Sequence, residues 1–257
     1  MRVTSCLVVA PLASVLMFGA VPARAETTAC TPITTLPAVI TVQGIYCFTQ
    51  HLDTGMTSGN AIEIRTNNVI LDLNGWKLGG LAAGSATDAR GIYAINRQNI
   101  TIRNGTVRGF RFGIFLQDSG ASQGHVVEDI RADQNTQTGM WVEGNGTLVR
   151  NNQVVGTGGT TFPPASFDRY GIFIEGTGPR VLNNDVIDVE RVEMPGVFAA
   201  STGILFFSAD GGLAVNNRIT NARAGIGFVD GTGKYRDNLT TNVTTPFVGG
   251  TAVGIND

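Results

Sequence analysis

The sequence is poor in charge, in histidine and in the residues that favour long surface helices. Of its 257 residues, 18 are Lys or Arg and 20 are Asp or Glu, so the formal net charge is −2. Without a basic excess, a nucleic-acid-binding protein is not expected. Lysine occurs only at Lys77 and Lys234, whereas Gly, Asn, Thr, Val and Ile are plentiful. This composition indicates a β-rich chain, and 42% hydrophobic residues argue against disorder.

Long apolar runs are absent except near the N-terminus. There a basic start is followed by an apolar stretch that ends at Val21, and Ala23 and Ala25 form a small-x-small cleavage site. The pattern predicts a secretory signal peptide over residues 1–25. A membrane anchor is the alternative, but the stretch is short for a bilayer and contains Pro11. We therefore expect a secreted or periplasmic protein with no membrane span after cleavage.

Cysteine is also scarce. Cleavage after residue 25 would leave Cys30 and Cys47. Two cysteines in an exported chain predict one disulfide that closes a short loop, and the chain-entropy model gives such a loop about 3 kcal/mol of stabilisation. Two free thiols are the alternative.

A short unit of glycine followed by apolar-x-apolar residues recurs along the chain. Successive units begin 22 to 32 residues apart, at Gly91, Gly113, Gly139, Gly171, Gly203 and Gly225, with a remnant at Gly254. No apolar period of 3.6 residues persists, so helix is expected to be minor. Strands stacked once per repeat predict a parallel β-solenoid of about seven coils, roughly 34 Å long at 4.8 Å per coil.

A polar pair, often Asn-Asn, recurs in the middle of each repeat. The pairs are Asn67-Asn68, Gln98-Asn99, Glu128-Asp129, Asn151-Asn152, Asn183-Asn184, Asn216-Asn217 and Asp237-Asn238. Asparagine tolerates the left-handed backbone of a tight turn, and stacked asparagines can bond to one another. We interpret this column as a structural hydrogen-bonded ladder.

The Gly-Ile strands, the Asn-Asn turns and the segment Asn68–Gly75 resemble right-handed parallel β-helix proteins of the pectin-lyase-like superfamily. The segment Cys30–Leu52 is similar to the start of its bacterial exported members. The resemblance implies an all-β, right-handed parallel β-helix over residues 61–257. Because a solenoid needs its ends covered, we expect residues 26–60 to form an N-terminal cap pinned by the disulfide. The resemblance leaves the activity open, because the superfamily includes lyases, hydrolases, epimerases and non-catalytic binders.

Side chains alternate along a strand, so the recurrent unit predicts two faces. The fifth positions include two glutamates, which a narrow core cannot bury unpaired; the first, third and fifth positions should therefore face outward. The outward third positions are Tyr93, Phe115, Trp141, Phe173 and Leu205. Such a stripe can form a platform for sugar rings; alternatively, inserted loops cover it as a second core.

The outward fifth positions Glu143 and Glu175 should be cross-strand neighbours with Cβ atoms about 5 Å apart. Like charges at this distance raise one pKa, and the spacing suits a retaining glycosidase. We place Arg111, Arg169 and Gln117 in the same patch, with Arg169 as a base or uronate clamp if the reaction is β-elimination. Calcium bound by the two glutamates is an alternative, no other cofactor is expected, and a solvated Glu pair bonded to arginines is the non-catalytic interpretation.

Several family signatures are missing. The Gly-Asp-Asp and Gly-His-Gly motifs of polygalacturonases and the Asp-Pro-His-Asp motif of alginate epimerases do not occur, and His51 and His125 are expected to be structural. We therefore expect an exported protein that binds a polysaccharide at Tyr93, Arg111, Phe115, Gln117, Trp141 and Phe173. If it is an enzyme, we expect a lyase or glycoside hydrolase that uses Glu143, Glu175 and Arg169. The alternative is a non-catalytic glycan- or protein-binding module of the cell envelope.

Overall fold

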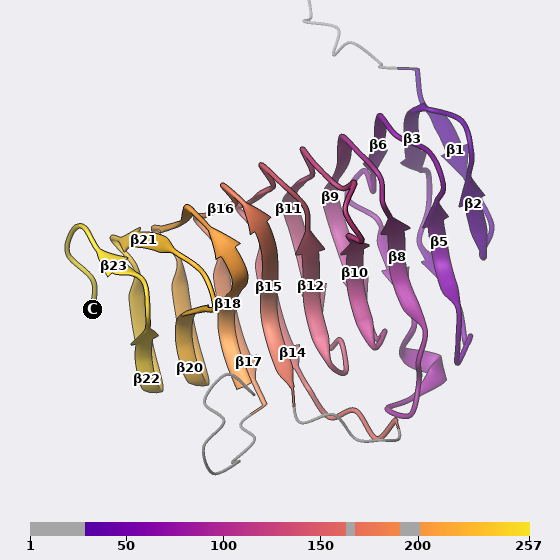
Figure 1. Cartoon of the computed structure of the whole chain (residues 1–257). Coiled ribbons are helices and arrows are strands. Elements are labelled where there is room, and N and C mark those ends of the chain that lie inside the picture. Colours follow the sequence, from indigo (N-terminus) through magenta and orange to yellow (C-terminus); the bar gives the residue numbers. More distant parts are fainter. Residues whose placement is uncertain (1–28, 163–167, 191–200) are drawn as a thin grey trace, which may run out of the picture.

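The computed structural model describes residues 29–162, 168–190 and 201–257, and the predicted signal peptide lies outside these ranges. The described chain winds into a parallel β-helix whose 23 strands form one continuous sheet around a central core (Figure 1). The helical element of these ranges is the 3-10 turn η1 (Leu81–Ala83). No helix in the described chain is long and apolar enough to cross a membrane.

The coils stack three rows of strands, and the first row, which we call the first face, carries the recurrent glycine units. It consists of β2 (Ala38–Ile40), β5 (Asn60–Ile64), β8 (Arg90–Ile95), β10 (Phe112–Gln117), β12 (Thr138–Glu143), β15 (Arg169–Thr177), β18 (Ser201–Asp210) and the ends of β20 (Arg218–Val229) and β22 (Leu239–Val248). The described first face thus has nine strands. It is longer than the sequence repeat indicates because β2, β5 and β22 lack the glycine unit.

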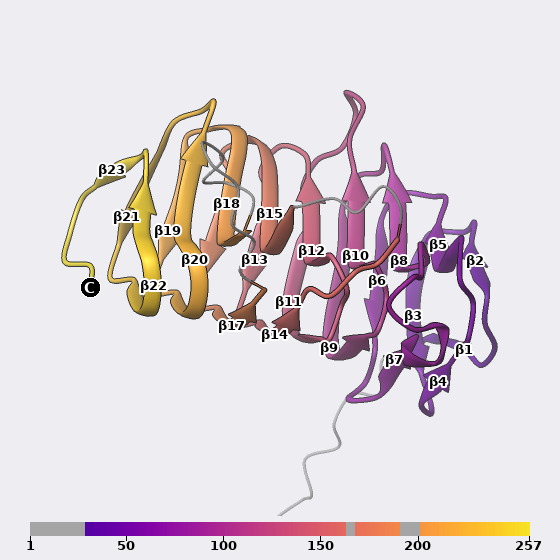
Figure 2. The same cartoon turned by 90° about the horizontal axis from the view of Figure 1, so that it is seen from below.

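The other two rows close the coil (Figure 2). The second row contains β1 (Thr31–Ile33), β3 (Gly44–Phe48), β6 (Val69–Asp72), the first parts of β9 (Ile100–Arg108) and β11 (Val126–Asp133), β13 (Leu148–Arg150), β16 (Arg180–Leu182), β19 (Gly212–Val215), β21 (Gly233–Arg236) and β23 (Thr251–Ala252). The third row contains β4 (Leu52–Asp53), β7 (Lys77–Gly79), β14 (Gln153–Thr157), β17 (Asp185–Val189) and the remaining parts of β9, β11, β20 and β22.

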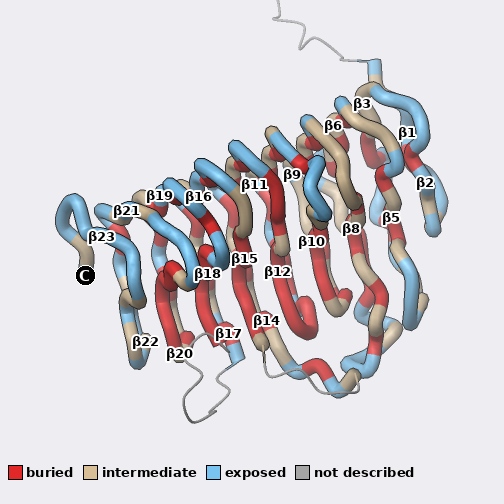
Figure 3. The backbone as a smooth tube through the Cα atoms, viewed as in Figure 1, coloured by how far each residue is buried: buried red, intermediate tan, exposed pale blue. Residues whose placement is uncertain are grey.

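The core lies inside the three rows. The residues that follow the recurrent glycines are fully buried there or nearly so, as predicted: Ile92, Ile114, Met140, Ile172, Ile204 and Ile226. The middle strands β10, β12 and β15 are mostly buried, whereas β22 and β23 are largely exposed (Figure 3). The last coil therefore extends the solenoid without a covering element in the described ranges.

Two columns of asparagine stack at the turns that connect strands of the second row to strands of the third row. The outer column has left-handed backbone, as at Asn151 and Asn183, with φ of 55° and 57°. The inner column is buried, and each side-chain amide donates to the next asparagine of the column at 3.0 Å, from Asn152 to Asn184 and from Asn184 to Asn217. The predicted structural ladder is confirmed.

A disulfide joins Cys30 to Cys47, as predicted. The segment predicted as a separate cap contributes regular strands to the helix, because β1 pairs in parallel with β3 and β2 pairs with β5. The described part of that segment is therefore the first winding of the solenoid, with no break at residue 60.

Candidate functional site

The outer surface of the first face carries a row of apolar side chains in register, one per strand. Tyr93 pairs with Phe115, Phe115 with Trp141, and Trp141 with Phe173. Their ring centroids are 5.7, 5.4 and 3.9 Å apart in that order, and the row ends on Leu205. We call these five side chains the aromatic row. These contacts agree with the prediction that the five side chains point outward on the same face.

A second outward row was missed by strict alternation. A Cβ atom at Gly91 would lie 2.8 Å from Val107 Cγ1 in the core, so the glycine position points inward, where the sequence pattern predicted outward. The residue after the glycine is also buried, so two consecutive positions point inward and the regular alternation is interrupted. The residue before the glycine therefore lies on the outside, in a second row beside the aromatic row. Phe112 stacks on Phe115 with centroids 4.9 Å apart, and Tyr170 contacts Phe173 at 5.3 Å.

Exposure along the aromatic row is uneven. Phe173 and Leu205 are buried and form a second cluster with Tyr170, outside the main core. Trp141 and Tyr93 remain half-buried. The two alternatives of an open platform and a covered second core therefore both occur, each on a different part of the row. Trp141 and Tyr93 are the rings that can meet a ligand.

Glu143 and Glu175 are paired in register at the ends of β12 and β15, as the repeat predicted. Glu143 is only 8% exposed, and both of its carboxylate oxygens are engaged. Oε1 accepts from the Trp141 indole N–H and Oε2 from the Asp118 backbone N–H, each at 2.5 Å. Burial raises the pKa of Glu143, these two hydrogen bonds oppose the rise, and the charges of Glu175 and Asp118 add to it.

Glu175 is more open than its neighbour, being half-buried. Burial raises the pKa of its carboxyl above the ordinary value, and the negative charge of Asp118 raises it further. The two glutamates therefore differ in accessibility while both favour the protonated form more than a free glutamate does. Glu175 is the member of the pair that can reach a substrate.

Asp118 is a third acid of this site and was not predicted. It follows Gln117 directly, and its Oδ1 accepts the backbone N–H groups of Gly120, Ala121 and Ser122 at 2.7 to 2.8 Å. Burial alone would raise the pKa of Asp118, but these hydrogen bonds outweigh it and hold the pKa below its ordinary value. The Asp-Ser-Gly sequence after an outward residue was the available signal.

No arginine or lysine in the described ranges lies within ion-pair distance of these three acids. The same ranges hold no group of three or more His, Cys, Asp or Glu side chains arranged to hold a metal ion. The site around these acids is therefore negatively charged whenever they ionise, and this charge disfavours an anionic sugar at the acids.

Arg111 and Arg169, predicted as part of the acidic patch, are engaged elsewhere. Arg111 Nη1 lies 2.6 Å from Asp88 Oδ1, and its guanidinium lies over the Phe162 ring, 4.5 Å from the centroid. Arg169 is buried and pairs with Glu190 at 2.8 Å. It precedes Glu175 by six residues on one strand, or about 20 Å. The predicted grouping of Arg169 with the acids is therefore wrong.

The remaining predicted polar residues have local partners. Gln117 Oε1 accepts the Tyr93 hydroxyl at 3.2 Å on the first face. The buried His125 accepts the backbone N–H of Ile100 through Nδ1, and burial lowers its pKa to about 4. The Nδ1 of His51 accepts a backbone N–H at 3.1 Å. Structural roles fit both histidines.

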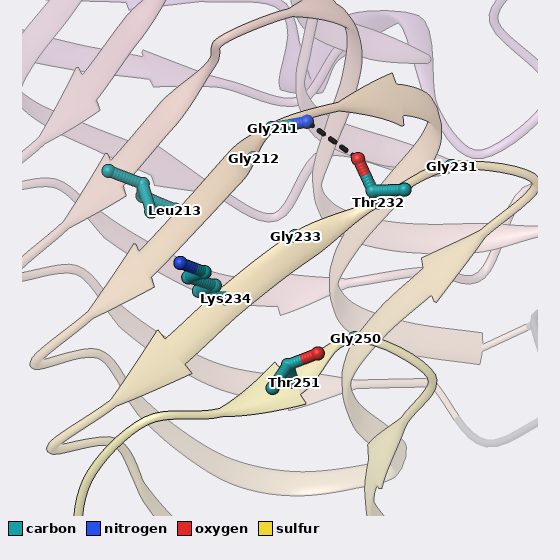
Figure 4. A pocket seen from close by; sticks show the side chains of 9 residues that line it. All are labelled: Gly211, Gly212, Leu213, Gly231, Thr232, Gly233, Lys234, Gly250 and Thr251. Carbon is teal, nitrogen blue, oxygen red and sulfur yellow. Dashed lines mark hydrogen bonds between the residues drawn. The ribbon is translucent and has the colours of Figure 1, made fainter.

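A hollow lies away from the acids, on the turns after β18 and β20 (Figure 4). It has a volume of about 480 Å³, is lined mainly by glycines and includes one cation, Lys234. A Cβ atom at Gly233 would lie 2.0 Å from the Phe228 ring in the interior. These glycines make room for the stacked Phe206 and Phe228, whose centroids are 4.4 Å apart, so the hollow follows from core packing.

The sequence matches the model of one protein family over residues 54–187 and 90–256, and that family is described as a right-handed β-helix region. The chain belongs to this family. The match and the neighbouring structures confirm the predicted parallel β-helix fold. A comparison with curated proteins found no match.

Solved structures with this fold include the enzymatically active domain of tailspike protein 2 from bacteriophage CBA120, with 13% identity and a TM-score of 0.57 over 88% of this chain and 39% of that one. An alginate lyase from Paenibacillus sp. FPU-7 has 16% identity and a TM-score of 0.52 over 84% of this chain and 86% of that one. A DFA-IIIase from Arthrobacter chlorophenolicus A6 has 12% identity and a TM-score of 0.50 over 86% and 67%. This chain thus spans about two fifths of the tailspike domain.

Proposed function

We propose that this chain is an exported carbohydrate-active β-helix that binds a polysaccharide on the first face and hydrolyses one of its glycosidic bonds. The observation that carries the proposal is the in-register pair Glu143 and Glu175 beside the half-exposed ring of Trp141. Aromatic faces pack against the C–H faces of sugars, and paired carboxyl groups supply acid catalysis of glycosidic cleavage.

The geometry supports different proposed roles for the two glutamates. Glu175 is the accessible acid with a raised pKa, and it donates a proton to the leaving glycosidic oxygen. The carboxylate of Glu143 is held in place by Trp141 and the Asp118 amide, and it faces the positive charge that develops on the sugar. Side chains on adjacent strands lie about 5 Å apart, the spacing of enzymes that retain the anomeric configuration.

Hydrolysis is favoured over β-elimination by the position of the cations. Removing the proton next to a uronate carboxylate requires a positive group that neutralises this carboxylate. Arg111 and Arg169 were the candidates, but they are paired with Asp88 and Glu190. A uronate placed at Glu143 and Glu175 would meet carboxylates instead.

A non-catalytic glycan-binding role is the second candidate. It is favoured by the low exposure of Glu143 and by the engagement of both its oxygens. In this role the glutamate would orient the indole of Trp141, and the first face would bind a glycan without cleaving it.

The similar structures support the carbohydrate-active proposal. Their descriptions name an enzymatically active tailspike domain, an alginate lyase and a DFA-IIIase in complex with GF2, all built on this fold. Export is supported by the signal-peptide pattern of residues 1–25 and by the disulfide between Cys30 and Cys47.

A panel of neutral and uronate-containing polysaccharides tests the proposal. Released reducing ends report hydrolysis, and ultraviolet absorbance of unsaturated products reports β-elimination. We expect reducing ends without absorbance from the wild type, and product of retained configuration by NMR. Unsaturated products would overturn the hydrolytic assignment. Binding without turnover in the wild type, Glu143→Gln and Glu175→Gln would leave the non-catalytic module.

Trp141→Ala is expected to weaken glycan binding by about 10- to 100-fold, because the indole is a half-exposed ring at the centre of the aromatic row. Isothermal titration calorimetry measures the loss. Trp76→Ala is the matched control, since Trp76 is the second of two tryptophans and lies against His51 outside the first face. Equal affinities for wild type and Trp141→Ala would remove the platform from the proposal.

A further inference from the structure

Arg90 stands on the outer surface of the first face, one strand before Phe112 in the second outward row. Its guanidinium lies over two rings of the aromatic row, 5.0 Å from the centroid of Tyr93 and 5.4 Å from that of Phe115. The side chain is half-buried, so it is held against the rings while part of it remains open to solvent. Arg90 is therefore a fixed positive charge on the proposed glycan-binding surface.

Within the described ranges, Arg90 shares with Arg97 the absence of an acidic partner, but only Arg90 has its guanidinium over rings of the aromatic row. No acidic side chain of the described ranges lies within ion-pair distance of it, whereas Arg65, Arg111 and Arg169 each pair with a carboxylate. Its Nε is buried with no hydrogen-bond partner, and Nη1 has a long contact of 3.5 Å to Asn60 Oδ1. The part of the guanidinium that remains open to solvent can donate charge-assisted hydrogen bonds to an anionic ligand.

Charge is therefore separated along the first face. Arg90 of β8 is in register with Thr138 of β12, and Glu143 lies five residues further along β12. The two charges are therefore about 10 Å apart along the helix axis and about 17 Å apart along the strand direction. The acids Asp118, Glu143 and Glu175, near the ends of β10, β12 and β15, repel anions, and Arg90 at the start of β8 attracts them. A chain of uniformly acidic sugars would meet repulsion at the acids, and a wholly neutral chain would leave Arg90 unpaired.

We propose that Arg90 binds a carboxylate of the substrate, at a sugar removed from the cleaved bond, and that the substrate is a heteropolysaccharide in which single uronates are separated by neutral sugars. This inference rests on the proposed function and specifies its substrate class. The uronate carboxylate would accept hydrogen bonds from the guanidinium while its ring packs beside Tyr93, and a neutral sugar would occupy the position next to Glu143 and Glu175.

The test compares polymers that differ only in their carboxyl groups. Gellan carries one glucuronate in each repeat of its backbone, and xanthan carries one in the side chain of each repeat. Each polymer is compared with its carboxyl-reduced derivative, in which this uronate has become a neutral sugar. Polymannuronate is the uniformly acidic polymer. Affinity is measured by calorimetry for the wild type, Arg90→Gln, Arg90→Lys and the control Arg65→Gln, whose arginine is already paired with Glu63. Thermal unfolding verifies that each variant is folded.

We expect the wild type to prefer a carboxylated heteropolymer to its reduced form by about 10- to 100-fold, with a preference that falls as salt is added. Arg90→Gln should abolish this preference, Arg90→Lys should keep part of it, and Arg65→Gln should keep all of it. The proposal is overturned if Arg90→Gln weakens both forms equally, if the wild type binds no carboxylated heteropolymer, or if polymannuronate binds better than gellan and xanthan. Arg90-dependent binding without release of reducing ends would instead overturn the proposed hydrolysis and leave the carboxylate-binding role of Arg90 intact.

Discussion

Glu175→Gln is expected to lower kcat on a cleaved polysaccharide by about 10²- to 10⁴-fold, the contribution of a positioned general acid. Glutamine preserves the size of the side chain and removes the transferable proton. Because Glu175 is half-buried at a strand end and its ionisation is already disfavoured, folding should be little affected. Initial rates of reducing-end release measure the loss, and calorimetry should show unchanged glycan affinity.

The pH dependence provides a second readout for Glu175. Burial and the charge of Asp118 raise the pKa of this carboxyl, so its protonated form persists to higher pH than in a free glutamate. Since the proposed donor is the protonated form, the wild-type rate should decline as pH rises through this raised pKa. The residual rate of Glu175→Gln should lack that decline.

Glu63→Gln is the matched control for this experiment. Glu63 occupies the position of β5 that pairs with Tyr93, and its carboxylate is bound by Arg65 at 2.7 Å. It shares the first face but lies away from the acid pair, so its rate should stay within about twofold of the wild type. A Glu175→Gln variant with wild-type kcat would end the catalytic assignment of this residue.

Sequence reasoning reached the aromatic row and the glutamate pair because both depend only on the period of the repeat. The recurrent glycines define the register, and the register brings Trp141 beside Phe173 and Glu143 beside Glu175. The inward direction of the residue after each glycine followed from the same period. These features are properties of the repeating coil, so one correct alignment of units predicts all of them.

The missed residues lie where the coil departs from its ideal pattern. Phe112 and Arg90 face outward because the glycine position turns inward and interrupts the alternation of the strand. Asp118 reaches the acids through the turn after β10, whose backbone amides fix its carboxylate. Neither effect follows from a two-residue period.

The arginines show a different limit of sequence reasoning. The alternation of side chains along a strand placed Arg111 and Arg169 on the outside, but it could not predict which acidic side chains lie beside them. Asp88 and Glu190 come from connecting segments rather than from neighbouring units of the repeat, and they neutralise the two cations. The proposed substrate-binding cation, Arg90, is distinguished by its position over the rings of Tyr93 and Phe115, which only the three-dimensional structure reveals.

Asn184→Ala is expected to destabilise the protein by about 3 to 5 kcal/mol, a larger effect than substitution of the exposed asparagines at the same turns. The Oδ1 of Asn184 accepts both the backbone N–H and the side-chain amide of Asn152 at 3.0 Å. Its Nδ2 donates to Asn217 Oδ1 and to the carbonyls of Val149 and Leu182. Alanine would leave several of these fully buried groups without a partner, and each such group costs about 1 to 3 kcal/mol.

The adjacent residue supplies the control, because Asn183 shares the turn but belongs to the exposed outer column. Asn183→Gly keeps the backbone φ of 57° accessible and removes a side chain whose hydrogen bonds to Asn151 and Asn216 are exposed to water, so we expect a loss below about 1 kcal/mol. Urea denaturation followed by circular dichroism compares the two variants with the wild type. Equal destabilisation by both substitutions would mean that the turn conformation, rather than the buried ladder, holds successive coils together. A large loss for Asn184→Ala alone would show that the inner column fixes the register that the first face needs to align Glu143 with Glu175.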